Sequence, residues 1–406
     1  MSEWKKYKLG NLINVKHGFA FKGEFFSDQP TQDILLTPGN FKIGGGFKAD
    51  KFKYYNGDYP ADYILKEGDI LITMTDLSKA GDTLGYSAKI PKHSGIKYLH
   101  NQRLGLVQFK SDEIDPDFLY WVLRTKPYQF YIVGSATGST VKHTSPTRIC
   151  SYEFQAPKDI EEQRQIAQIL SSLDDKIELN LQMNHTLEAM AQAIFKEWFV
   201  DFDFPGFDGE LIDGLPKGWK RESIDENIEF LNGLALQKFP PLDEEEYLPV
   251  IKIRELRQGI TNSSDKASTA IPQKYIINDG DILFSWSGSL DVVMWSNGKG
   301  ALNQHLFKVS SEKYPKWFYY YWVKHFLPIY QSIAADKATT MGHIQRRHLK
   351  ESLINVPNSE FLEKANDVLE PIFDRLKNNS IQIRTLTQTR DTLLPKLMSG
   401  ELEIKN

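Results

Sequence analysis

Cysteine is almost absent from this sequence: the 406 residues include only Cys150. A single cysteine excludes an internal disulfide and a zinc site built from cysteines. No run of 18 apolar residues occurs, so we expect no membrane span, and the opening MSEWKKYK is not followed by the apolar stretch of a secretory signal. These absences favour a cytoplasmic protein, with Cys150 as a small residue in or near a core.

Motifs of enzymes that act on DNA or nucleotides are absent as well. The sequence has no Asn-Pro-Pro-Phe or Asp-Pro-Pro-Tyr loop of adenine methyltransferases, no Gly-x4-Gly-Lys-Ser/Thr phosphate loop and no His-Glu-x-x-His zinc motif. Pro116-Asp117 could begin a nuclease motif, but no acidic-x-Lys triplet follows, and both residues suit the first turn of a helix. We therefore predict no catalytic residue, no metal and no cofactor.

Acidic residues outnumber basic ones, 53 to 49, but the charge is segregated along the chain. Residues 1–157 carry +4 (20 basic against 16 acidic) and residues 215–357 carry +2 (18 against 16). Residues 158–214 carry −9 (4 against 13) and residues 358–406 carry −1 (7 against 8). Because a basic footprint is judged for each domain, the two basic blocks remain candidates for binding nucleic acid.

Five short segments recur in the same order in the two halves of the chain. The pairs are WKKYKLGNLINVKHGFAFK and WKRESIDENIEFLNGLALQK, GDILIT and GDILFS, NQRLGLV and NQHLFKV, GSTVKH and ATTMGH, and FQAP and INVP. Self-similarity of this kind indicates a duplicated domain. Each copy combines Gly-Asp turns leading into short strands with proline-started aromatic helices around Trp121 and Trp322, so we expect two similar mixed α/β domains.

Two long helices follow the two copies. Residues 161–199 contain no glycine or proline, and steps of four and three residues give an apolar seam there and again near the end of the chain. The seam contains Ile166, Leu170, Leu173, Ile177, Asn180 and Leu187 in the first helix and Leu369, Ile372, Leu376, Asn379, Leu386 and Leu393 in the second. Neither helix can bury its stripe alone, so we expect the two to pack together, antiparallel if a twofold relates the halves.

Asn180 and Asn379 are equivalent residues near the midpoints of these helices. We expect them to meet near the twofold axis and to fix the register of the pair. The alternative is that both lie on the flank of the seam. A helix of about 38 residues is about 57 Å long, so the pair could hold two similar domains at the spacing of two half-sites on DNA, about 35 Å or more.

In this order of elements the chain resembles the specificity subunits of type I restriction–modification systems. Landmarks are GLPKGW at 214–219, EEQRQIAQILSSLDDKI in the first long helix and TRDTLLPKLMSGEL in the last. The resemblance covers essentially the whole chain. It implies a non-catalytic subunit that reads one half of a bipartite double-stranded DNA site with each recognition domain. It also implies two methyltransferase subunits as partners, with restriction subunits in the full complex. Arg390 departs from the seam, which leaves the packing there open.

The resulting prediction is an α+β fold with two similar target-recognition domains held apart by two long antiparallel helices in a pseudo-twofold coiled coil. The domains are residues 1–157 (recognition domain 1), 158–200 (central conserved helix), 201–357 (linker and recognition domain 2) and 358–406 (distal conserved helix). A different class of function remains open: a symmetric scaffold whose paired domains bind protein and read no DNA.

Residues for DNA contact were sought among Arg, Lys, Asn, Gln, Ser and Thr in loops present in both halves. The first group is Thr73, Thr75, Ser78 and Lys79 with Ser285, Ser287 and Ser289; the second is Asn101, Gln102 and Arg103 with Asn303, Gln304 and His305. The third group is Ser139, Thr140, Lys142 and His143 with Thr339, Thr340, His343, Arg346 and Arg347; the fourth is Asn40 and Lys42 with Arg254 and Arg257. Alternatively, Asn-Gln pairs close turns and Ser/Thr clusters cap helices.

Differences between the halves are expected if they read different half-sites. Arg103 suits a guanine edge, and its counterpart is His305; Lys142 stands where the second half has Gly342.

The first long helix is too acidic to face DNA, because its carboxylates would repel phosphate. The acidic residues are Asp174, Asp175, Glu178, Glu188 and Glu197. They form either an ordinary solvated surface or a docking surface for the methyltransferase subunits. Apolar residues expected to be exposed off the seam favour docking: Ile169, Leu181, Met183, Met190, Phe195 and Phe199.

Overall fold

The structure, a computed structural model, describes residues 3–76, 78, 81–139, 141–241, 246–335 and 342–404. The chain divides into two compact units, which we call unit 1 (residues 1–175 with 388–406) and unit 2 (residues 176–387). Among the described helices, none combines the length and apolar character needed to span a bilayer.

Unit 1 is built on an antiparallel sheet with the strand order β2-β10-β6-β8. A second sheet, β3-β5-β4-β9, contains the parallel pair β4 and β9, and β1 pairs with β12. The strands are β1 (Trp4–Lys8), β2 (Ile13–His17), β3 (Phe26–Ser27), β4 (Asp33–Leu36), β5 (Lys53–Tyr55), β6 (Ile70–Thr73), β7 (Thr75–Asp76), β8 (Ser87–Lys89), β9 (Lys97–His100), β10 (Leu104–Phe109), β11 (Lys142–His143) and β12 (Glu153–Pro157). The short helices are α1 (Leu9–Leu12), α2 (Pro116–Val122), α3 (Lys126–Gly134) and α4 (Pro146–Cys150).

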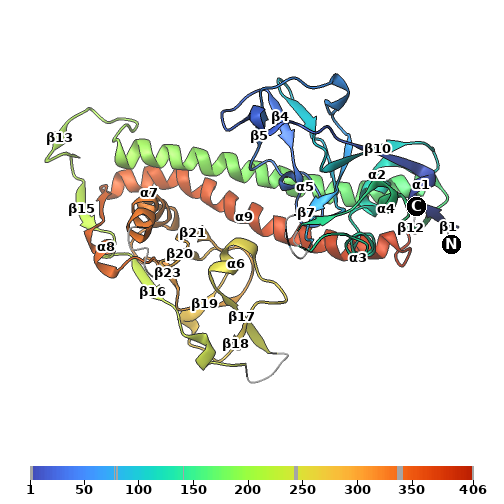
Figure 1. The fold of residues 1–406 in the computed structure, drawn as a ribbon. Helices are drawn as coiled ribbons and strands as arrows, with labels where there is room; N and C mark the ends of the chain where they lie inside the picture. Colours follow the sequence, from blue (N-terminus) through green and yellow to red (C-terminus); the bar gives the residue numbers. More distant parts are fainter. Residues whose placement is uncertain are drawn as a thin grey trace. The chain divides into compact units, whose positions relative to one another are not determined.

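Unit 2 repeats this plan with the antiparallel sheet β16-β23-β20-β21, covered by α7 (Figure 1). Its second sheet, β18-β17-β22-β19, contains the parallel pair β17 and β22, and β15 pairs with β24. The strands are β13 (Leu211–Ile212), β14 (Leu215–Pro216), β15 (Lys220–Ser223), β16 (Glu229–Asn232), β17 (Tyr247–Ile251), β18 (Lys266–Ser268), β19 (Ile276–Ile277), β20 (Ile282–Ser285), β21 (Asp291–Met294), β22 (Gly300–Leu302), β23 (Leu306–Ser310) and β24 (Leu353–Val356). The helices are α6 (Ile253–Gln258), α7 (Lys316–Ala335) and α8 (Arg346–Glu351).

The duplication inferred from sequence is confirmed by this topology. Both copies have a glycine just after the first strand of the antiparallel sheet, where two backbone segments approach closely. A Cβ on Gly18 would lie 2.1 Å from the Asn101 carbonyl oxygen, and a Cβ on Gly233 would lie 2.3 Å from that of Asn303. Glycine is therefore required at both positions, because the two backbones approach too closely for any side chain.

The predicted strand and helix signals agree with the structure. GDIL leads into β6 and β20. The Asp115 carboxylate caps α2 by accepting from the backbone amides of Asp117 and Phe118, with Pro116 in the first turn, so Pro116-Asp117 is a helix start. Trp121 and Trp322 are both fully buried in the cores of their units.

The two long helices are α5 (Ile160–Phe195), which ends in one π-helical turn at Lys196–Val200, and α9 (Ser359–Met398). In unit 1, Ile166 and Leu170 of α5 share a core with Leu393 and Leu397 of α9. In unit 2 the late residues of α5 meet the early residues of α9, as in the cluster of Ala191 and Phe195 with Ala365 and Leu369. Within unit 2 the pairing is antiparallel, since Asn180 bonds Gln382 while Asn184 bonds Ser380.

None of the predicted seam residues is exposed. Ile166, Leu170, Ile177, Asn180, Leu369, Leu376 and Asn379 are buried, and Leu173, Leu187, Ile372, Leu386 and Leu393 are half-buried. The expected pairing of Asn180 with Asn379 is wrong in detail. The Asn180 amide donates to Gln382 (2.7 Å) and the Asn379 amide donates to Asn184 (2.9 Å). Two amide pairs therefore occupy the seam, because each asparagine meets a residue one turn along the opposite helix.

Three expectations about the surface of α5 are corrected. Phe195 and Phe199, expected to be exposed, are 3% and 0% exposed in the core of unit 2, where they stack on each other with ring centroids 5.1 Å apart. Asp174 is not simply solvated, because it pairs with Arg124 and Arg390. Glu188 likewise pairs with Lys324 (2.6 Å). Arg390 therefore departs from the seam because it is an ionic partner of α5.

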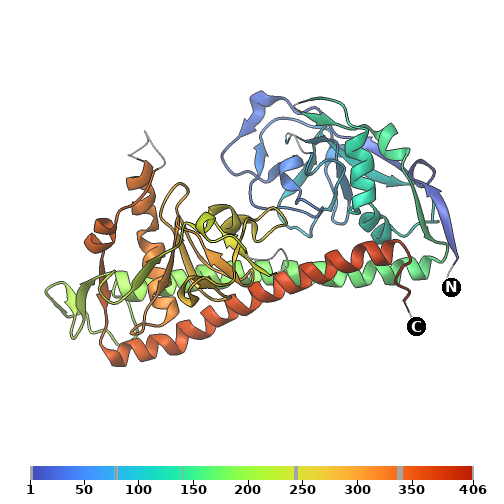
Figure 2. The same cartoon turned by 90° about the horizontal axis from the view of Figure 1, so that it is seen from below.

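The two ends of the chain lie near each other in unit 1 (Figure 2). After α9 the backbone turns at Gly400 with φ of +74°. A Cβ there would approach the Trp4 ring to 2.9 Å, so both the turn and the contact require glycine. The end of α9 is thereby fixed beside β1.

Candidate nucleic-acid interface

In each unit the first residue of the first predicted group uses its hydroxyl to form hydrogen bonds within its own hairpin. Thr73 is fully buried and its hydroxyl donates to the Thr83 carbonyl. Ser285, its counterpart, is also fully buried; its hydroxyl donates to the Ser289 carbonyl (2.8 Å) and accepts from the Asp291 amide (2.8 Å). These two hydroxyls are used within the domain, so we withdraw them as candidates for DNA contact.

The second group is a turn built twice by an asparagine. The Asn101 side-chain oxygen accepts from the Arg103 amide (2.9 Å), and the Asn303 oxygen accepts from the His305 amide (3.3 Å). Both asparagines are buried, so their role is to close the turn, as the alternative interpretation held. The turn in unit 1 leaves Gln102 and Arg103 exposed, and the turn in unit 2 leaves Gln304 and His305 half-buried.

The first and third groups lie side by side in both units. In unit 1, β7 pairs with β11, which sets Thr75 opposite His143 with their side chains 3.2 Å apart (Oγ1 to Nδ1). In unit 2 an isolated bridge sets Ser287 opposite His343. The Ser287 hydroxyl lies 3.1 Å from Nδ1 of His305, so the second group joins the same site.

The loop after β7 is organised by a buried carboxylate. Asp76 accepts from the amides of Ser78 (2.7 Å) and Thr83 (2.6 Å). Burial alone would raise the pKa of this carboxyl, but the backbone hydrogen bonds outweigh it and hold the pKa below the usual value. The carboxylate stays ionised at neutral pH and keeps the loop closed. The Ser78 hydroxyl accepts from the amides of Gly81 and Asp82, so it too serves the loop.

The remaining members of the third group differ in exposure. Ser139 and His143 are exposed and Lys142 is half-buried. Arg346 and Arg347 are exposed on α8; Arg346 donates to the Phe230 carbonyl (2.9 Å) and covers the Phe307 ring. Lys79, Thr140, Thr339 and Thr340 lie outside the described residues.

The fourth group is corrected by the two short capping turns that follow β4 and β17. Asn40 accepts from the Thr37 amide (2.9 Å), and Glu255 accepts from the Lys252 amide (3.1 Å). Asn40 is thus equivalent to Glu255, and Lys42 to Arg257. Asn40 is 1% exposed and its amide also donates to the Lys48 and Lys51 carbonyls, so we withdraw it as a DNA contact. Lys42 is half-buried.

In unit 2 the fourth group joins the first. Arg257, which is exposed on α6, donates to the Ser289 hydroxyl. Arg254 donates to the Glu255 carboxylate (2.9 and 2.7 Å) and to the Ser263 carbonyl (2.9 Å). Burial would raise the pKa of Glu255, but Arg254 and Ser264 lower it, so the buried carboxylate stays charged beneath the guanidinium. Both arginines are therefore fixed in direction before any ligand binds.

Sequence reasoning missed a tryptophan at the centre of the unit 2 site. The Trp286 ring is half-buried between His305 and His343, with centroids 6.0 and 6.3 Å away. Its indole donates to Asn232 (3.0 Å). Only polar residue types were candidates for DNA contact, so Trp286 was not predicted. The signal available was the pairing of GDILFSW with GDILITM, which sets Trp286 against the buried Met74.

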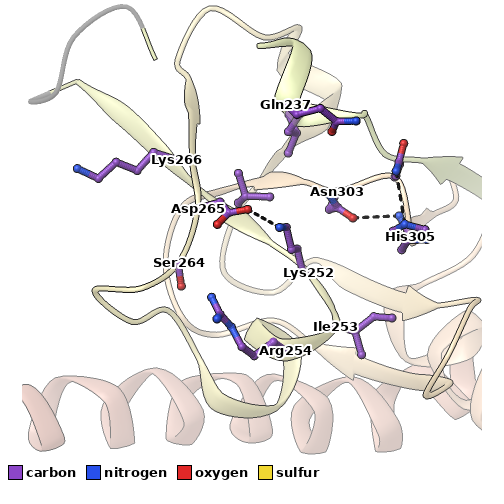
Figure 3. Close-up of a pocket in the computed structure, with 12 residues that line it drawn as sticks. Gln237, Lys252, Ile253, Arg254, Ser264, Asp265, Lys266, Asn303 and His305 are labelled. Atoms are coloured by element: carbon purple, nitrogen blue, oxygen red, sulfur yellow. Dashed lines mark hydrogen bonds and ion pairs between the residues drawn. The ribbon is translucent and has the colours of Figure 1, made fainter. Parts of the chain in front are cut away.

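A pocket of about 720 Å³ opens beside these residues in unit 2. Arg254 lines it on one side and the Asn303–His305 turn on another, so two of the predicted groups share one cavity (Figure 3). Lys252, Asp265, Lys266 and Gln237 also line it and were not predicted. Within the described residues, no group of three or more His, Cys, Asp or Glu side chains is placed to hold a metal ion.

The chain was compared with known families and proteins. A family model described as the type I restriction modification DNA specificity domain matches residues 1–189 and again residues 216–385. The MjaIX specificity subunit of a type I restriction enzyme from Methanocaldococcus jannaschii is 28% identical over 310 residues, 72% of this chain and 71% of that protein. The HindI specificity subunit from Haemophilus influenzae is 24% identical over 491 aligned positions, 99% of this chain and 100% of that protein.

A solved structure of a type I restriction–modification S subunit from M. genitalium has a similar fold. It aligns over 100% of this chain and 97% of its own with a TM-score of 0.63 at 16% identity. The family match covers most of the sequence and falls once on each copy of the duplicated domain. The chain therefore belongs to the family of type I restriction–modification DNA specificity subunits.

Proposed function

We propose that this chain reads a bipartite DNA site, one half with each recognition domain, and serves as the scaffold for methyltransferase subunits. Recognition domain 1 comprises residues 1–157 and recognition domain 2 follows the linker within residues 201–357. The helical segments 158–200 and 358–406 set the gap between the two half-sites. Restriction subunits join in the full complex, and the chemistry belongs to the partner subunits.

The observation that carries this proposal is the assembly of equivalent polar loops in both units. In each unit the loop after the GDIL strand lies beside a histidine-bearing segment, as in Thr75 with His143 and Ser287 with His343. The scaffolds agree while the presented residues differ, as with Arg103 and His305. Two readers of different half-sites require this combination, because direct readout depends on the side chains presented in the groove.

Docking of methyltransferase subunits is supported by apolar residues of α5 that lie off the seam. Leu179, Leu181 and Met190 are 50%, 41% and 49% exposed. A partner that buries these side chains gains the hydrophobic free energy they forgo in the isolated subunit.

Sequencing of methylated sites in a host that carries this chain and its methyltransferase tests the reading of two half-sites. We expect one bipartite sequence with a fixed gap. Exchange of residues 1–157 for the domain of another specificity subunit should change one half of that sequence and preserve the other. A change in both halves would contradict modular reading.

A salt titration separates this proposal from a protein-binding scaffold. Binding through several phosphates weakens steeply with salt, with a slope of about −0.9 per phosphate contact for duplex DNA. We expect such a slope for the complex of this chain with its methyltransferase subunits. A complex without measurable affinity for DNA carrying the methylated site would support the scaffold instead.

A further inference from the structure

The pocket in unit 2 combines an apolar floor with a charged rim. Leu236, Val250 and Ile253 provide the apolar surface. Three cations and one carboxylate stand around it: Lys252, Arg254, Lys266 and Asp265. The charge balance is positive, and the volume of about 720 Å³ lies within the range of pockets that enclose a small molecule.

The cations are held in place by the domain itself. Arg254 is fixed by Glu255, which is only 1% exposed and remains ionised. Lys252 pairs with Asp265 across the pocket (Figure 3). Lys266 lies over the Tyr247 ring, 4.0 Å from its centroid. A guanidinium fixed by a buried carboxylate loses little freedom when it binds a phosphate, which favours binding.

The opposite wall offers hydrogen-bonding groups of the kind that read a base. Gln304 and His305 come from the turn that Asn303 closes, and Gln237 lies on another side. The His305 ring is held at both nitrogens, at Nδ1 by the Ser287 hydroxyl (3.1 Å) and at Nε2 by the Gln304 amide nitrogen (3.4 Å), which leaves the Gln304 oxygen to accept from a base. Amide and imidazole groups at this wall, cations at the rim and an apolar floor between them match the three parts of a nucleotide: base edge, phosphate and base face.

Unit 1 forms the same turn without the two cations nearest the pocket. In the two capping turns Lys252 is equivalent to Thr37, and Arg254 to Gly39. The equivalence follows because the backbone amides of Thr37 and Lys252 each donate to the side chain of the residue three positions later. The turn forms in both units, and only unit 2 places positive charge on it. Arg254 neutralises Glu255, a buried carboxylate that stands where unit 1 has the neutral Asn40, so unit 2 has a fixed guanidinium beside the pocket that unit 1 lacks.

We propose that the unit 2 pocket binds one nucleotide whose base has left the DNA stack. The base lies on the floor with its edge toward Gln304, and its phosphate lies at Arg254. Unstacking a base costs free energy, and the burial of the base with charge-assisted phosphate contacts offsets that cost. This inference rests on the proposed DNA reading and assigns unit 2 a mode of recognition that unit 1 lacks.

Fluorescent base analogues provide the test. Each position of both half-sites, once known from methylation sequencing, is replaced in turn by an analogue of the same base that brightens when unstacked. The full chain with its methyltransferase subunits is then added. We expect the fluorescence to rise several-fold at one position of the half-site read by unit 2. This position is not that of the base that becomes methylated.

Two variants assign the rise to the pocket. Lys252→Thr with Arg254→Gly installs the residues of unit 1 and should abolish the rise, and the milder Arg254→Gln should reduce it severalfold. Lys299→Gln, at an exposed cation of unit 2 that does not line the pocket, should leave the rise intact. Thermal melting of each variant shows whether unit 2 remains folded, and Arg254→Gln keeps the test valid if the double variant does not.

The outcomes are distinguishable. Specific DNA binding with no rise at any position outside the methylated base, or a rise that persists in folded Arg254→Gln, overturns the pocket and leaves the proposed function intact. Absence of specific DNA binding overturns both. Titration of the four deoxynucleoside monophosphates without DNA distinguishes the source: saturable binding that Arg254→Gln removes, with no rise on DNA, assigns the pocket to a free nucleotide and overturns the DNA inference.

Discussion

The two units attach their recognition sheets to the long helices by the same geometry but with different chemistry. In unit 1 the Arg124 guanidinium lies 5.1 Å from the Tyr120 ring centroid and pairs with Asp174 of α5 (2.7 Å). In unit 2 the Lys324 ammonium lies 5.0 Å from the Tyr320 ring centroid and pairs with Glu188 (2.6 Å). A tyrosine followed four residues later by a cation thus recurs in both units. Aligning the two helices at Trp121 and Trp322 does not reveal it, because that alignment sets Arg124 against His325.

The difference lies in what surrounds the ion pair. Arg124 has 3% of its side chain exposed, also donates to the Gly44 carbonyl (3.0 Å), and shares Asp174 with Arg390 of α9. Lys324 is 25% exposed, and unit 2 adds a cluster of tilted aromatic rings around Phe199. Both attachments have an apolar core, but unit 1 adds a buried arginine–carboxylate contact where unit 2 has a more exposed ion pair and more aromatic rings. The lesson is that duplicated geometry can persist while its source of stability changes.

Truncation of Phe199 should have the largest effect. The side chain is fully buried among Trp219, Trp317 and Phe361, so Phe199→Ala removes its burial and leaves a cavity. We expect a loss of about 4 kcal/mol from the free energy of unfolding of unit 2. Hydrogen exchange resolved by segment measures it. The control is Met190→Ala on the exposed face of α5, which should change little; a small effect of Phe199→Ala would remove the apolar half of the comparison.

Loss of Arg124 should cost more than loss of Lys324. Arg124→Met leaves the Gly44 carbonyl without its donor and weakens the neutralisation of Asp174, and we expect a loss of about 3 kcal/mol in unit 1. Lys324→Met removes a more exposed pair, for which we expect about 1 kcal/mol. Denaturant unfolding of both variants measures the difference. Equal losses would show that the two attachments do not differ in their dependence on charge.

Conversion of Arg390 to the apolar residue that the seam predicts should have a smaller effect. In Arg390→Leu, Asp174 keeps its stronger partner Arg124, while the leucine adds apolar contact to the helix pair. We expect a net loss of about 1 kcal/mol or less from the free energy of unfolding. The same denaturant series checks it. A loss as large as that of Arg124→Met would make Arg390 the principal partner of Asp174.

Acid should weaken unit 1 through Asp174. Burial would raise the pKa of this carboxyl, but Arg124 and Arg390 outweigh it and hold the pKa below its usual 3.8. A depressed pKa contributes stability that is present above the unfolded value and lost as pH falls through the folded value. Urea unfolding from about pH 5 downward should show this loss in the wild type. In Asp174→Asn the free energy of unfolding should not show this loss. The same dependence of the free energy of unfolding on pH in both proteins would contradict the prediction.

Much of the fold could be predicted from sequence because its signals are local or periodic. The GDIL turns, the helix start at Pro116-Asp117 and the heptad seam each depend on neighbouring residues, and each agrees with the structure. The failures were at longer range. Phe195 and Phe199 are off the seam and were expected to be exposed, but aromatic rings of α7 cover them. Asn180 and Asn379 were expected to pair, but the offset between the helices gives each another amide.

The candidate site was predicted as groups of residue types, and no sequence rule separates a hydroxyl that reads DNA from one that closes a loop. Asn40, Thr73 and Ser285 prove to serve their own loops, because each side chain turns inward to groups of the same loop or hairpin, and the residue type does not reveal that direction. Trp286, Lys252 and Asp265 were missed for the converse reason. They join the site only because β17, β20 and the Asn303 turn meet.

The sequence by itself determined the duplication, the two long helices and the family, since repeats, heptads and motif order are written along the chain. Only the tertiary structure decided which polar side chains are buried and which line a pocket. It also decided that unit 1 contacts Asp174 of α5 through two arginines and that unit 2 packs aromatic rings around Phe199. These outcomes depend on contacts between residues distant in sequence, and local pattern carries no information about them.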